Sequence, residues 1–227
     1  MSTPAVPARD CALCPRLAAF RAANQAAFAS WHNAPVPSFG ALDARLLVVG
    51  LGPGLRGANR TGRPFTGDYA GDLLYATLLK FGFARGAYRA PRDDEAWTGD
   101  GLSLVGTRVT NAVRCVPPEN KPLPAEIRSC RGFLAAEIAA MARLHTIVAL
   151  GRVAHDAVLA ALALRGRDFA FGHGAVHRLD AHRRLADSFH CSRYNTNTGR
   201  LTPAMFEAVF AAVQADLDAT PVSPGRA

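Results

Sequence analysis

Two short segments carry unbroken apolar runs, and they restrict the fold of this 227-residue chain more than any other feature. They are Arg45 to Gly50 (RLLVVG) and Thr146 to Gly151 (TIVALG). A strand without a polar face has to be covered on both sides, as strands inside a parallel sheet are. Arg108 to Val113 and Arg184 to Ser188 also have strand character. The sequence therefore predicts a buried parallel sheet.

Helical patterns separate the predicted strands. Because strands that alternate with helices form parallel sheets covered on both faces, we expect an α/β fold. Thr202 and Pro203 are suited to the N-cap and first turn of the last helix. We predict one domain over residues 1–219 and a flexible C-terminal tail over residues 220–227. The helical segments are Leu13 to Phe28, Asp72 to Phe81, Ala125 to Arg143, Val153 to Leu164 and Thr202 to about Leu217.

The composition favours an acidic partner. The formal net charge is +8 and the pI about 9.8, and of 26 basic residues only Lys80 and Lys121 are lysine. The net charge suits a polyanion such as DNA, whereas a GC-rich genome explains most of the preference for arginine. The chain has neither an apolar run of the ~20 residues that a membrane helix needs nor an apolar signal-peptide core at its start. We therefore expect a soluble, cytoplasmic protein without membrane contact.

Four of the five cysteines form a pattern that one metal centre would explain. Cys11 and Cys14 form a CxxC near the N-terminus, and Cys115 and Cys130 follow much later. Disulfides are the alternative, but thiols stay reduced in a protein that is not exported. Grouped thiolates hold iron-sulfur clusters or zinc, and the spacing alone leaves both open.

The first loop, Gly50 to Asp68 (GLGPGLRGANRTGRPFTGD), has six glycines in nineteen positions. Gly52 to Gly57 matches GxGxxG after a strand, but the helix and second-strand acid of a dinucleotide site are missing. We interpret the loop as a glycine-built pocket wall that ends in an aromatic ring, Phe65, and a carboxylate, Asp68.

Two further loops carry polar residues, the second loop (Arg114 to Pro124) and the third loop (Phe189 to Leu201), whereas Gly86 to Gly101 is predicted to be a plain surface connection. Asn111 lies near the end of a predicted strand, and its amide could match the edge of a pyrimidine or simply satisfy loop backbone. The segment FHCSRYNTNTGRLT places His190 within a polar run, although a lone histidine is more often structural than catalytic. Loops that follow parallel strands gather at one edge of the sheet, so these residues are predicted to meet.

Taken together, the motifs resemble those of a known family. GLGPG, GANRTGRPFTGD, TNAVRCVPPENKP and HCSRYNTNTGRLT, with the four cysteines, resemble the family 5 (type B) uracil-DNA glycosylases of the iron-sulfur branch of the uracil-DNA glycosylase superfamily. The resemblance extends from about Cys11 to Val213. It implies a three-layer α/β/α fold around a four-stranded parallel sheet, a 4Fe-4S cluster, and monofunctional excision of deaminated bases from DNA.

The resemblance also implies roles for individual residues. A flipped-out base would stack on Phe65, pair with Asn111 and contact the Gly50, Gly52 and Gly54 backbone, while His190 and Asp68 act in catalysis. The implied cluster ligands are Cys11, Cys14, Cys115 and Cys130. The implied DNA contacts are Arg60, Arg63, Ser192, Arg193, Tyr194, Asn195 and Arg200.

Two departures from the family pattern carry expectations. Cys191 stands where the family usually has proline, which we expect to loosen the loop that enters the minor groove. Gly52 replaces a usual alanine, which we expect to widen the pocket slightly. Because no polar side chain stands at Gly52, we expect hypoxanthine as a second substrate, with xanthine and hydroxymethyluracil as further candidates. Independently of this position, we expect a monomeric enzyme.

Two rival hypotheses remain open from sequence. A non-catalytic nucleic-acid-binding protein could hold zinc on the same four thiolates, although zinc ribbons usually pair their cysteines. A related glycosylase that traps DNA covalently is expected to carry a histidine-bearing insertion after the first motif, and GLRGANRTGRPFTGD lacks one.

Overall fold

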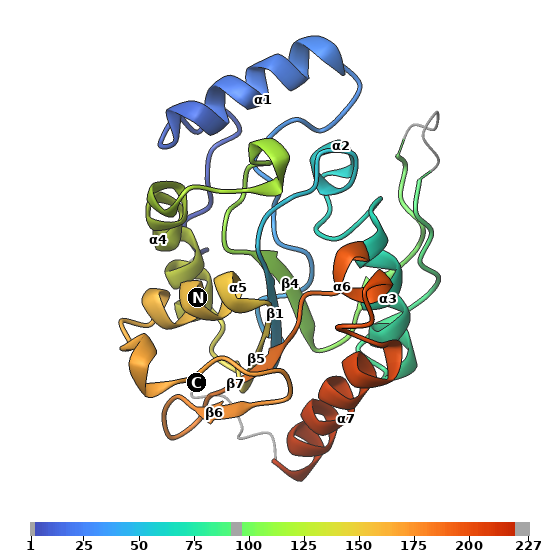
Figure 1. The fold of residues 1–227 in the computed structure, drawn as a ribbon, viewed down its shortest axis with the longest axis vertical. Helices are drawn as coiled ribbons and strands as arrows, with labels where there is room; N and C mark the ends of the chain where they lie inside the picture. Colours follow the sequence, from blue (N-terminus) through green and yellow to red (C-terminus); the bar gives the residue numbers. More distant parts are fainter. Residues whose placement is uncertain (1–2, 92–96, 221–227) are drawn as a thin grey trace.

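The computed structural model describes residues 3–91 and 97–220. The predicted tail after residue 220 lies outside the described residues, so its predicted flexibility stays a prediction. The chain forms an α/β fold around a five-stranded sheet (Figure 1). In spatial order the strands are β4 (Thr107–Asn111), β1 (Leu46–Gly50), β5 (Thr146–Leu150), β7 (Arg184–Ser188) and β6 (Val176–Arg178).

The first four strands are parallel, as the sequence predicts. The fifth strand, β6, pairs with β7 in the antiparallel direction and forms the edge of the sheet. It has only three residues, and Val176 is 57% exposed. Such a strand has no buried apolar face, which explains why the sequence pattern does not reveal it.

Helices cover both faces of the sheet (Figure 1). Side chains at alternate positions of a strand point to opposite faces. Leu46 and Val48 pack with the helices α3 (Tyr69–Lys80) and α7 (Pro203–Ala219) on one side. Leu47 and Val49 pack with α4 (Pro124–Ala140) and α5 (Arg152–Ala161) on the other. All four side chains are fully buried, and each contributes about 1.5–3 kcal/mol to folding. The three-layer prediction is therefore confirmed.

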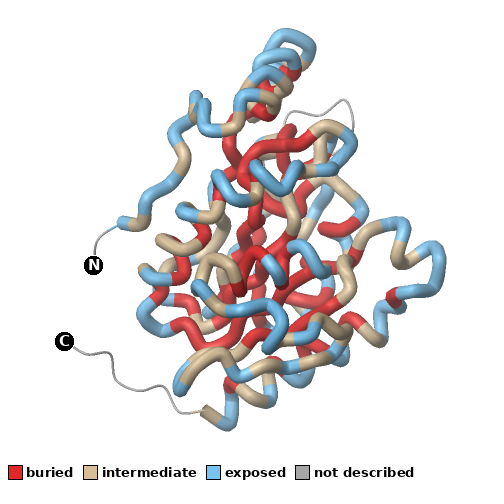
Figure 2. Tube along the Cα trace, turned by 60° about the vertical axis from the view of Figure 1, so that its left-hand side comes forward, coloured by how far each residue is buried: buried red, intermediate tan, exposed pale blue. Residues whose placement is uncertain are grey.

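The helix α1 (Pro15–Ala27) lies outside these layers and is exposed along much of its length (Figure 2). Leu17 is buried against Val113 and Cys115 of the second loop. Arg16 donates two hydrogen bonds of 2.8 Å to the carboxylate of Glu126 in α4. Contacts to residues that are distant in sequence therefore hold this helix in place.

No helix in residues 3–91 or 97–220 has both the length and the apolar character that crossing a bilayer requires.

The remaining elements are short. The short elements are α2 (Ala58–Thr61), α6 (Arg193–Asn197), the hairpin β2 (Ala84–Arg85) and β3 (Ser103–Leu104), and the 3₁₀ turns η1 (Pro118–Asn120) and η2 (Gly166–Asp168).

Candidate functional site

Residues from the loops after three parallel strands meet at the carboxyl edge of the sheet. Gly50 and Asn111 end the neighbouring strands β1 and β4 and are partners in register. A Cβ atom on Gly50 would lie 2.4 Å from Cζ of Phe65 and 2.5 Å from Oδ1 of Asn111. The rings of Phe65 and His190 stack with their centroids 5.9 Å apart. Phe65 and Asn111 therefore pack directly on Gly50, where any side chain would clash, and the imidazole of His190 lies against the ring of Phe65.

The amide of Asn111 lacks a protein partner at its oxygen. Asn111 is 3% exposed, and its Oδ1 is buried without a hydrogen bond from any described residue. Buried polar atoms nearly always have partners, so this acceptor is available to a ligand that donates a hydrogen bond. The ligand-pairing interpretation of Asn111 is compatible with this placement and stays a prediction.

Phe65 has an unusual backbone conformation, with a φ of +54°. A bulky residue adopts the left-handed region only when its surroundings enforce it. The carbonyl oxygen of Phe65 packs against Gly71, where a Cβ atom would be 1.8 Å away. The hydroxyl of Tyr75 donates a 2.6 Å hydrogen bond to the carbonyl of Pro64. The backbone on either side of Phe65 is therefore fixed.

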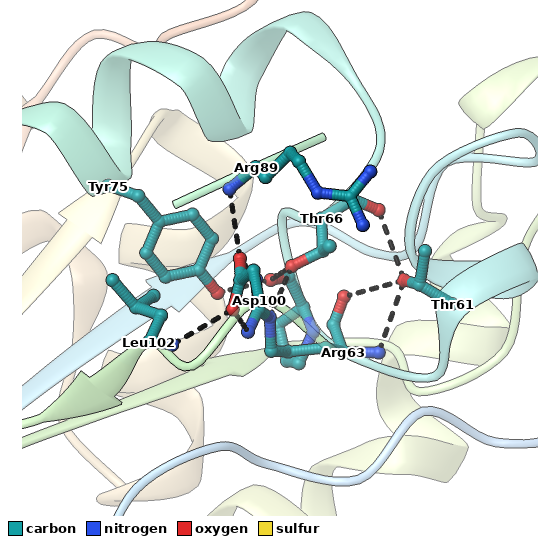
Figure 3. Close-up of polar contacts among 8 residues, drawn as sticks. Thr61, Arg63, Thr66, Tyr75, Arg89, Asp100 and Leu102 are labelled. Carbon is teal, nitrogen blue, oxygen red and sulfur yellow. Dashed lines mark hydrogen bonds and ion pairs between the residues drawn. The ribbon is translucent and has the colours of Figure 1, made fainter. Parts of the chain in front are cut away.

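Arg63 belongs to the same network (Figure 3). Its guanidinium donates to Thr66 Oγ1 at 2.7 Å and to both carboxylate oxygens of Asp100 at 2.7 and 2.6 Å. Its Cζ lies 4.8 Å from the ring centroid of Trp97 and 5.2 Å from that of Tyr75. The side chains of Arg63 and Asp100 are 11% and 1% exposed. The hypothesis that Arg63 contacts DNA does not agree with this buried placement.

Sequence reasoning missed the contribution of Asp100. We expected Gly86 to Gly101 to be a plain surface connection, and its described part includes the carboxylate that anchors the first loop. The N–H groups of Arg89 and Leu102 also donate to Asp100, each at 3.0 Å (Figure 3). Burial alone would raise the pKa of Asp100, but these donors and the Arg63 guanidinium lower it to about 2. The expectation was wrong because a pairing between two loops leaves no periodic signal.

His190 is held as a neutral imidazole. Burial lowers the pKa of His190 to about 4, because nothing nearby compensates for the loss of water around a charged ring. The amide nitrogen of Asn195 donates a 2.8 Å hydrogen bond to the His190 carbonyl. At neutral pH the ring can therefore donate an N–H while carrying no charge.

Asp68 caps the helix α3 with one carboxylate oxygen. Its Oδ1 accepts a 3.3 Å hydrogen bond from the N–H of Gly71. Its Oδ2 lies 2.9 and 2.5 Å from the positions that Cβ atoms on Gly54 and Gly57 would take. Burial raises the pKa of Asp68, partly offset by the N–H groups that it accepts. One carboxylate oxygen of Asp68 therefore caps α3, while the other faces the glycines of the first loop.

The two departures from the family pattern lie in different surroundings. Cys191 is fully buried, and its thiol donates a 3.4 Å hydrogen bond to the carbonyl of Ala70, so it anchors the loop that we expected it to loosen. A Cβ atom on Gly52 would contact Val113 and Pro117 at 3.6–3.8 Å. Any space gained from the missing methyl group at Gly52 therefore lies beside the second loop and not between Phe65 and Asn111.

The third loop presents side chains to solvent near the pocket. Tyr194 is 73% exposed, and the guanidinium of Arg193 lies 5.4 Å from the ring centroid of Tyr69. Ser192 caps α6 by accepting from the N–H of Asn195 at 3.4 Å.

Two further arginines predicted to contact DNA, Arg200 and Arg60, differ in their surroundings. The guanidinium of Arg200 lies 4.7 Å from the ring centroid of Phe189, beside the same third loop. Arg60, by contrast, is 7% exposed and lies 5.9 Å from the ring centroid of Trp31. Its hypothesised DNA contact, like that of Arg63, does not agree with its burial.

Cys11, Cys14, Cys115 and Cys130 line one hollow between α1, the second loop and α4. Two of the sulfurs accept N–H groups: Cys130 from the Arg114 backbone at 3.4 Å and Cys115 from the Arg21 guanidinium at 3.5 Å. Burial raises the pKa of Cys115 to about 11, with the Arg21 charge opposing it, and raises those of Cys14 and Cys130. All five cysteines are unpaired. The donor set fits a thiolate-held metal centre, because all four thiols line one hollow and N–H groups donate to two of the sulfurs.

The chain is similar to known proteins along most of its length. The pattern of the "Uracil DNA glycosylase superfamily" matches residues 37–214. The chain is 45% identical to the Type-5 uracil-DNA glycosylase of Thermus thermophilus, covering 86% of this chain and 89% of that protein. It is 39% identical to the Type-5 uracil-DNA glycosylase of Pyrobaculum aerophilum, covering 91% and 89%. The Type-4 uracil-DNA glycosylase of Thermotoga maritima is 36% identical over 51% of this chain.

Proposed function

Because the chain belongs to the uracil-DNA glycosylase superfamily and is a monofunctional DNA glycosylase, we propose that its pocket takes uracil flipped out of DNA and releases it by hydrolysis. The observation that carries this proposal is the contact of Phe65 and Asn111 at Gly50, with the His190 ring stacked against Phe65. A base inside a duplex is inaccessible, so extrusion comes first and is least costly for a mispaired base. Stacking on one aromatic ring contributes roughly 1–3 kcal/mol.

The substrate range follows from the edge that Asn111 would read. Uracil presents a ring N–H beside a carbonyl, and a carboxamide offers the complementary acceptor and donor. Hypoxanthine gains the same arrangement when adenine is deaminated, and xanthine keeps it from guanine. Hydroxymethyluracil keeps it as well. The unpartnered Oδ1 of Asn111 supports recognition of this shared edge, so excision of hypoxanthine is expected alongside that of uracil.

Cleavage of the N-glycosidic bond leaves negative charge on the base and positive charge on the sugar. A neutral His190 donates its N–H to the base oxygen that gains charge, without transferring the proton. Its low pKa supports this role, since a neutral imidazole keeps a proton on one nitrogen only. Water adds to the sugar carbon, its proton is released, and the base leaves with the bonding electrons. Removing one such donor lowers the rate by about a hundredfold to a thousandfold.

Asp68 orients the water and stabilises the cationic sugar in this proposal. The support is the division of its carboxylate, in which Oδ1 caps α3 and Oδ2 faces the glycine wall. The variant Asp68→Asn keeps a good N-cap, because asparagine and aspartate cap helices equally well. It should therefore fold normally and excise uracil much more slowly.

We assign the main DNA contacts to the third loop. Tyr194 and Arg193 would enter the minor groove and fill the space that the flipped base leaves, and Arg200 would contact the strand. Ser192 and Asn195 would position His190 from behind. The surface placement of Tyr194 supports the wedge role. We expect the enzyme to act as a monomer.

The four thiols are proposed to hold a 4Fe-4S cluster as a structural centre. The support is their common hollow, the N–H donors to two sulfurs, and the position of this hollow beside α1 instead of among the catalytic residues. Iron and sulfide analysis tests the assignment, with broad visible absorption expected. A colourless protein that contains one zinc ion would contradict it and favour zinc.

The deciding experiment uses a duplex with one uracil opposite guanine, followed by alkaline cleavage at any abasic site. We expect wild type to yield the cleaved strand and Asp68→Asn to yield little in single-turnover reactions. Asp168→Asn, at an exposed carboxylate, is the matched control. No cleavage by wild type would refute the proposed function. Near-normal rates for Asp68→Asn would exclude Asp68 from the mechanism. A gel-mobility shift of the DNA that survives denaturation of the protein would indicate covalent trapping.

A further inference from the structure

Three potential metal ligands converge between α5 and the strands β6 and β7, and none of them is assigned to excision or to DNA. They are His155 in α5, His177 in β6 and Asp187 in β7, and together they form the His–Asp cluster. One ligand atom from each side chain lies within 4.8 Å of the other two. The strand β6 lies at the opposite end of the molecule from α1, so the cluster is separate from the thiol hollow beside α1 (Figure 1).

The carboxylate of Asp187 is the centre of the His–Asp cluster. Its Oδ1 lies 2.7 Å from Nδ1 of His155, and its Oδ2 lies 3.2 Å from Nε2 of His177. Asp187 is fully buried, and its Oδ2 also accepts the N–H of Gly172 at 3.3 Å. A buried carboxylate needs cationic or hydrogen-bonding partners. Both imidazoles direct a nitrogen at this one anion.

The ring of His155 has the orientation that a metal ligand needs. Its Nε2 lies 3.0 Å from the carbonyl oxygen of Phe169, so this nitrogen carries a proton and donates it. A neutral imidazole has only one proton, which leaves a lone pair on Nδ1 directed at the Asp187 oxygen. The two repel each other unless a second proton or a metal ion lies between them. Histidines in metal sites usually donate their other ring N–H to a carbonyl or a carboxylate in this way.

The spacing of the ligand atoms is close to that of a zinc site. Zinc binds imidazole nitrogen at about 2.0–2.1 Å and carboxylate oxygen at about 2.0–2.2 Å, so neighbouring ligand atoms of a tetrahedral site are about 3.4 Å apart. The separation of 3.2 Å between His177 and Asp187 nearly meets this value. His155, at 2.7 Å, would have to withdraw by about 0.7 Å to admit the ion.

The His–Asp cluster is enclosed on one side and accessible on the other. The ring of Phe171 lies 5.6 Å from that of His155, and the ring of Phe169 lies 5.9 Å from that of His177. The side chain of His155 is 1% exposed, whereas that of His177 is 17% exposed. An ion can therefore enter beside His177, where a water molecule can complete its coordination.

We propose that His155, His177 and Asp187 bind one zinc ion, with water as the fourth ligand, and that the ion fastens β6 to β7 and α5. Zinc takes the place of the proton between His155 and Asp187, which is released to solvent. The strand β6 has only three residues and an exposed valine, Val176, so few apolar contacts hold it. The inference goes beyond the proposed function and does not depend on it.

The test measures the zinc that the full-length protein retains. Wild type and variants are incubated with zinc chloride, separated from free zinc by gel filtration, and analysed for zinc per chain. His177→Gln is the main variant, because glutamine can still donate a hydrogen bond to Asp187 but is not a usual zinc ligand. Wild type should retain one zinc ion per chain more than His177→Gln or His177→Ala. Zinc held by the four thiols would be equal in all of them and cancels in the comparison.

Thermal unfolding gives a second measurement and a control. Zinc that binds the folded protein should raise the Tm of wild type as its concentration rises. The zinc concentration needed for the same rise should be at least tenfold to a hundredfold higher for His177→Gln, the range that loss of even an outer-shell partner causes. His182→Ala changes an exposed histidine outside the cluster and should behave as wild type in both measurements.

Three results would overturn the inference. One is equal zinc content in wild type and His177→Gln after loading. Another is a wild-type Tm that does not respond to zinc, which would leave the cluster with a hydrogen-bonding role alone. The third is the same zinc-dependent rise in wild type and both His177 variants, which would locate the ion elsewhere. Neither measurement uses uracil release, so failure of the proposed function would not be mistaken for failure of the zinc site.

Discussion

Replacing Asp100 by asparagine should destabilise the protein by about 2–3 kcal/mol at pH 7. A carboxylate with a pKa of about 2 when folded, against 3.8 in its ordinary state, contributes roughly 2.4 kcal/mol at 1.36 kcal/mol per pKa unit. Breaking a buried ion pair from one side usually costs about 3–5 kcal/mol. After the substitution, Arg63 would keep about 0.5–2 kcal/mol of cation–π attraction to the surrounding rings. We therefore expect a loss of stability closer to the first estimate than to the second.

The loss should depend on pH in a defined direction. The folded pKa of Asp100 lies below the unfolded one, so its contribution is complete above about pH 4 and disappears as pH falls toward 2. Urea unfolding of wild type and Asp100→Asn at pH 7 and at successively lower pH measures this difference. It should be largest at pH 7 and shrink below pH 4.

An exposed ion pair provides the matched control. Arg165 and Asp168 lie 2.9 Å apart with side chains 70% and 42% exposed, so Asp168→Asn should change stability by less than about 1 kcal/mol. Asp100→Asn should also raise the KM for uracil-containing DNA, because the left-handed backbone of Phe65 loses support. Equal stability of the two variants at pH 7 would refute the argument that this buried pair fixes the first loop.

Three further outcomes are expected. Excision should decline as pH falls through the raised pKa of Asp68, because a protonated carboxyl group no longer stabilises the cationic sugar, and a pH–rate profile without a decline on acidification would contradict this role. Gly50→Ala should abolish uracil release, because its methyl group would lie 2.4 Å from Cζ of Phe65 and 2.5 Å from Oδ1 of Asn111 and would displace both side chains, whereas Gly132→Ala in α4 meets no atom within 4 Å outside its own helix backbone and should remain active in the same assay. Cys191, which is fully buried with a pKa raised by burial, should resist iodoacetamide in the folded protein, and rapid alkylation measured by mass spectrometry would show that its loop opens.

The central fold could be predicted because its signals are local. The apolar runs that became β1 and β5 exclude an exposed sheet face, and the Thr202–Pro203 cap marks the start of α7 as observed. Parallel strands then bring their following loops to one edge, whatever the loop sequences are. That rule is sufficient to predict that Phe65, Asn111 and His190 would meet.

The missed features depend on pairings between loops. Arg63 and Asp100 are 37 positions apart, and nothing in the residues around either one indicates the other. The same applies to Arg60, whose burial beside Trp31 could not be distinguished from a surface position.

The position of the thiol hollow has a consequence for the order of assembly. Joining Cys14 to Cys115 closes a loop of about 100 residues, and a crosslink of that length lowers the entropy of the unfolded chain by an amount equivalent to about 4.7 kcal/mol. A cofactor held by these four thiols, as proposed, would meet this entropic cost in full unless β1, β4 and α4 had already brought the second loop and Cys130 together. We therefore expect the sheet to fold first and maturation to follow, with α1 docking last.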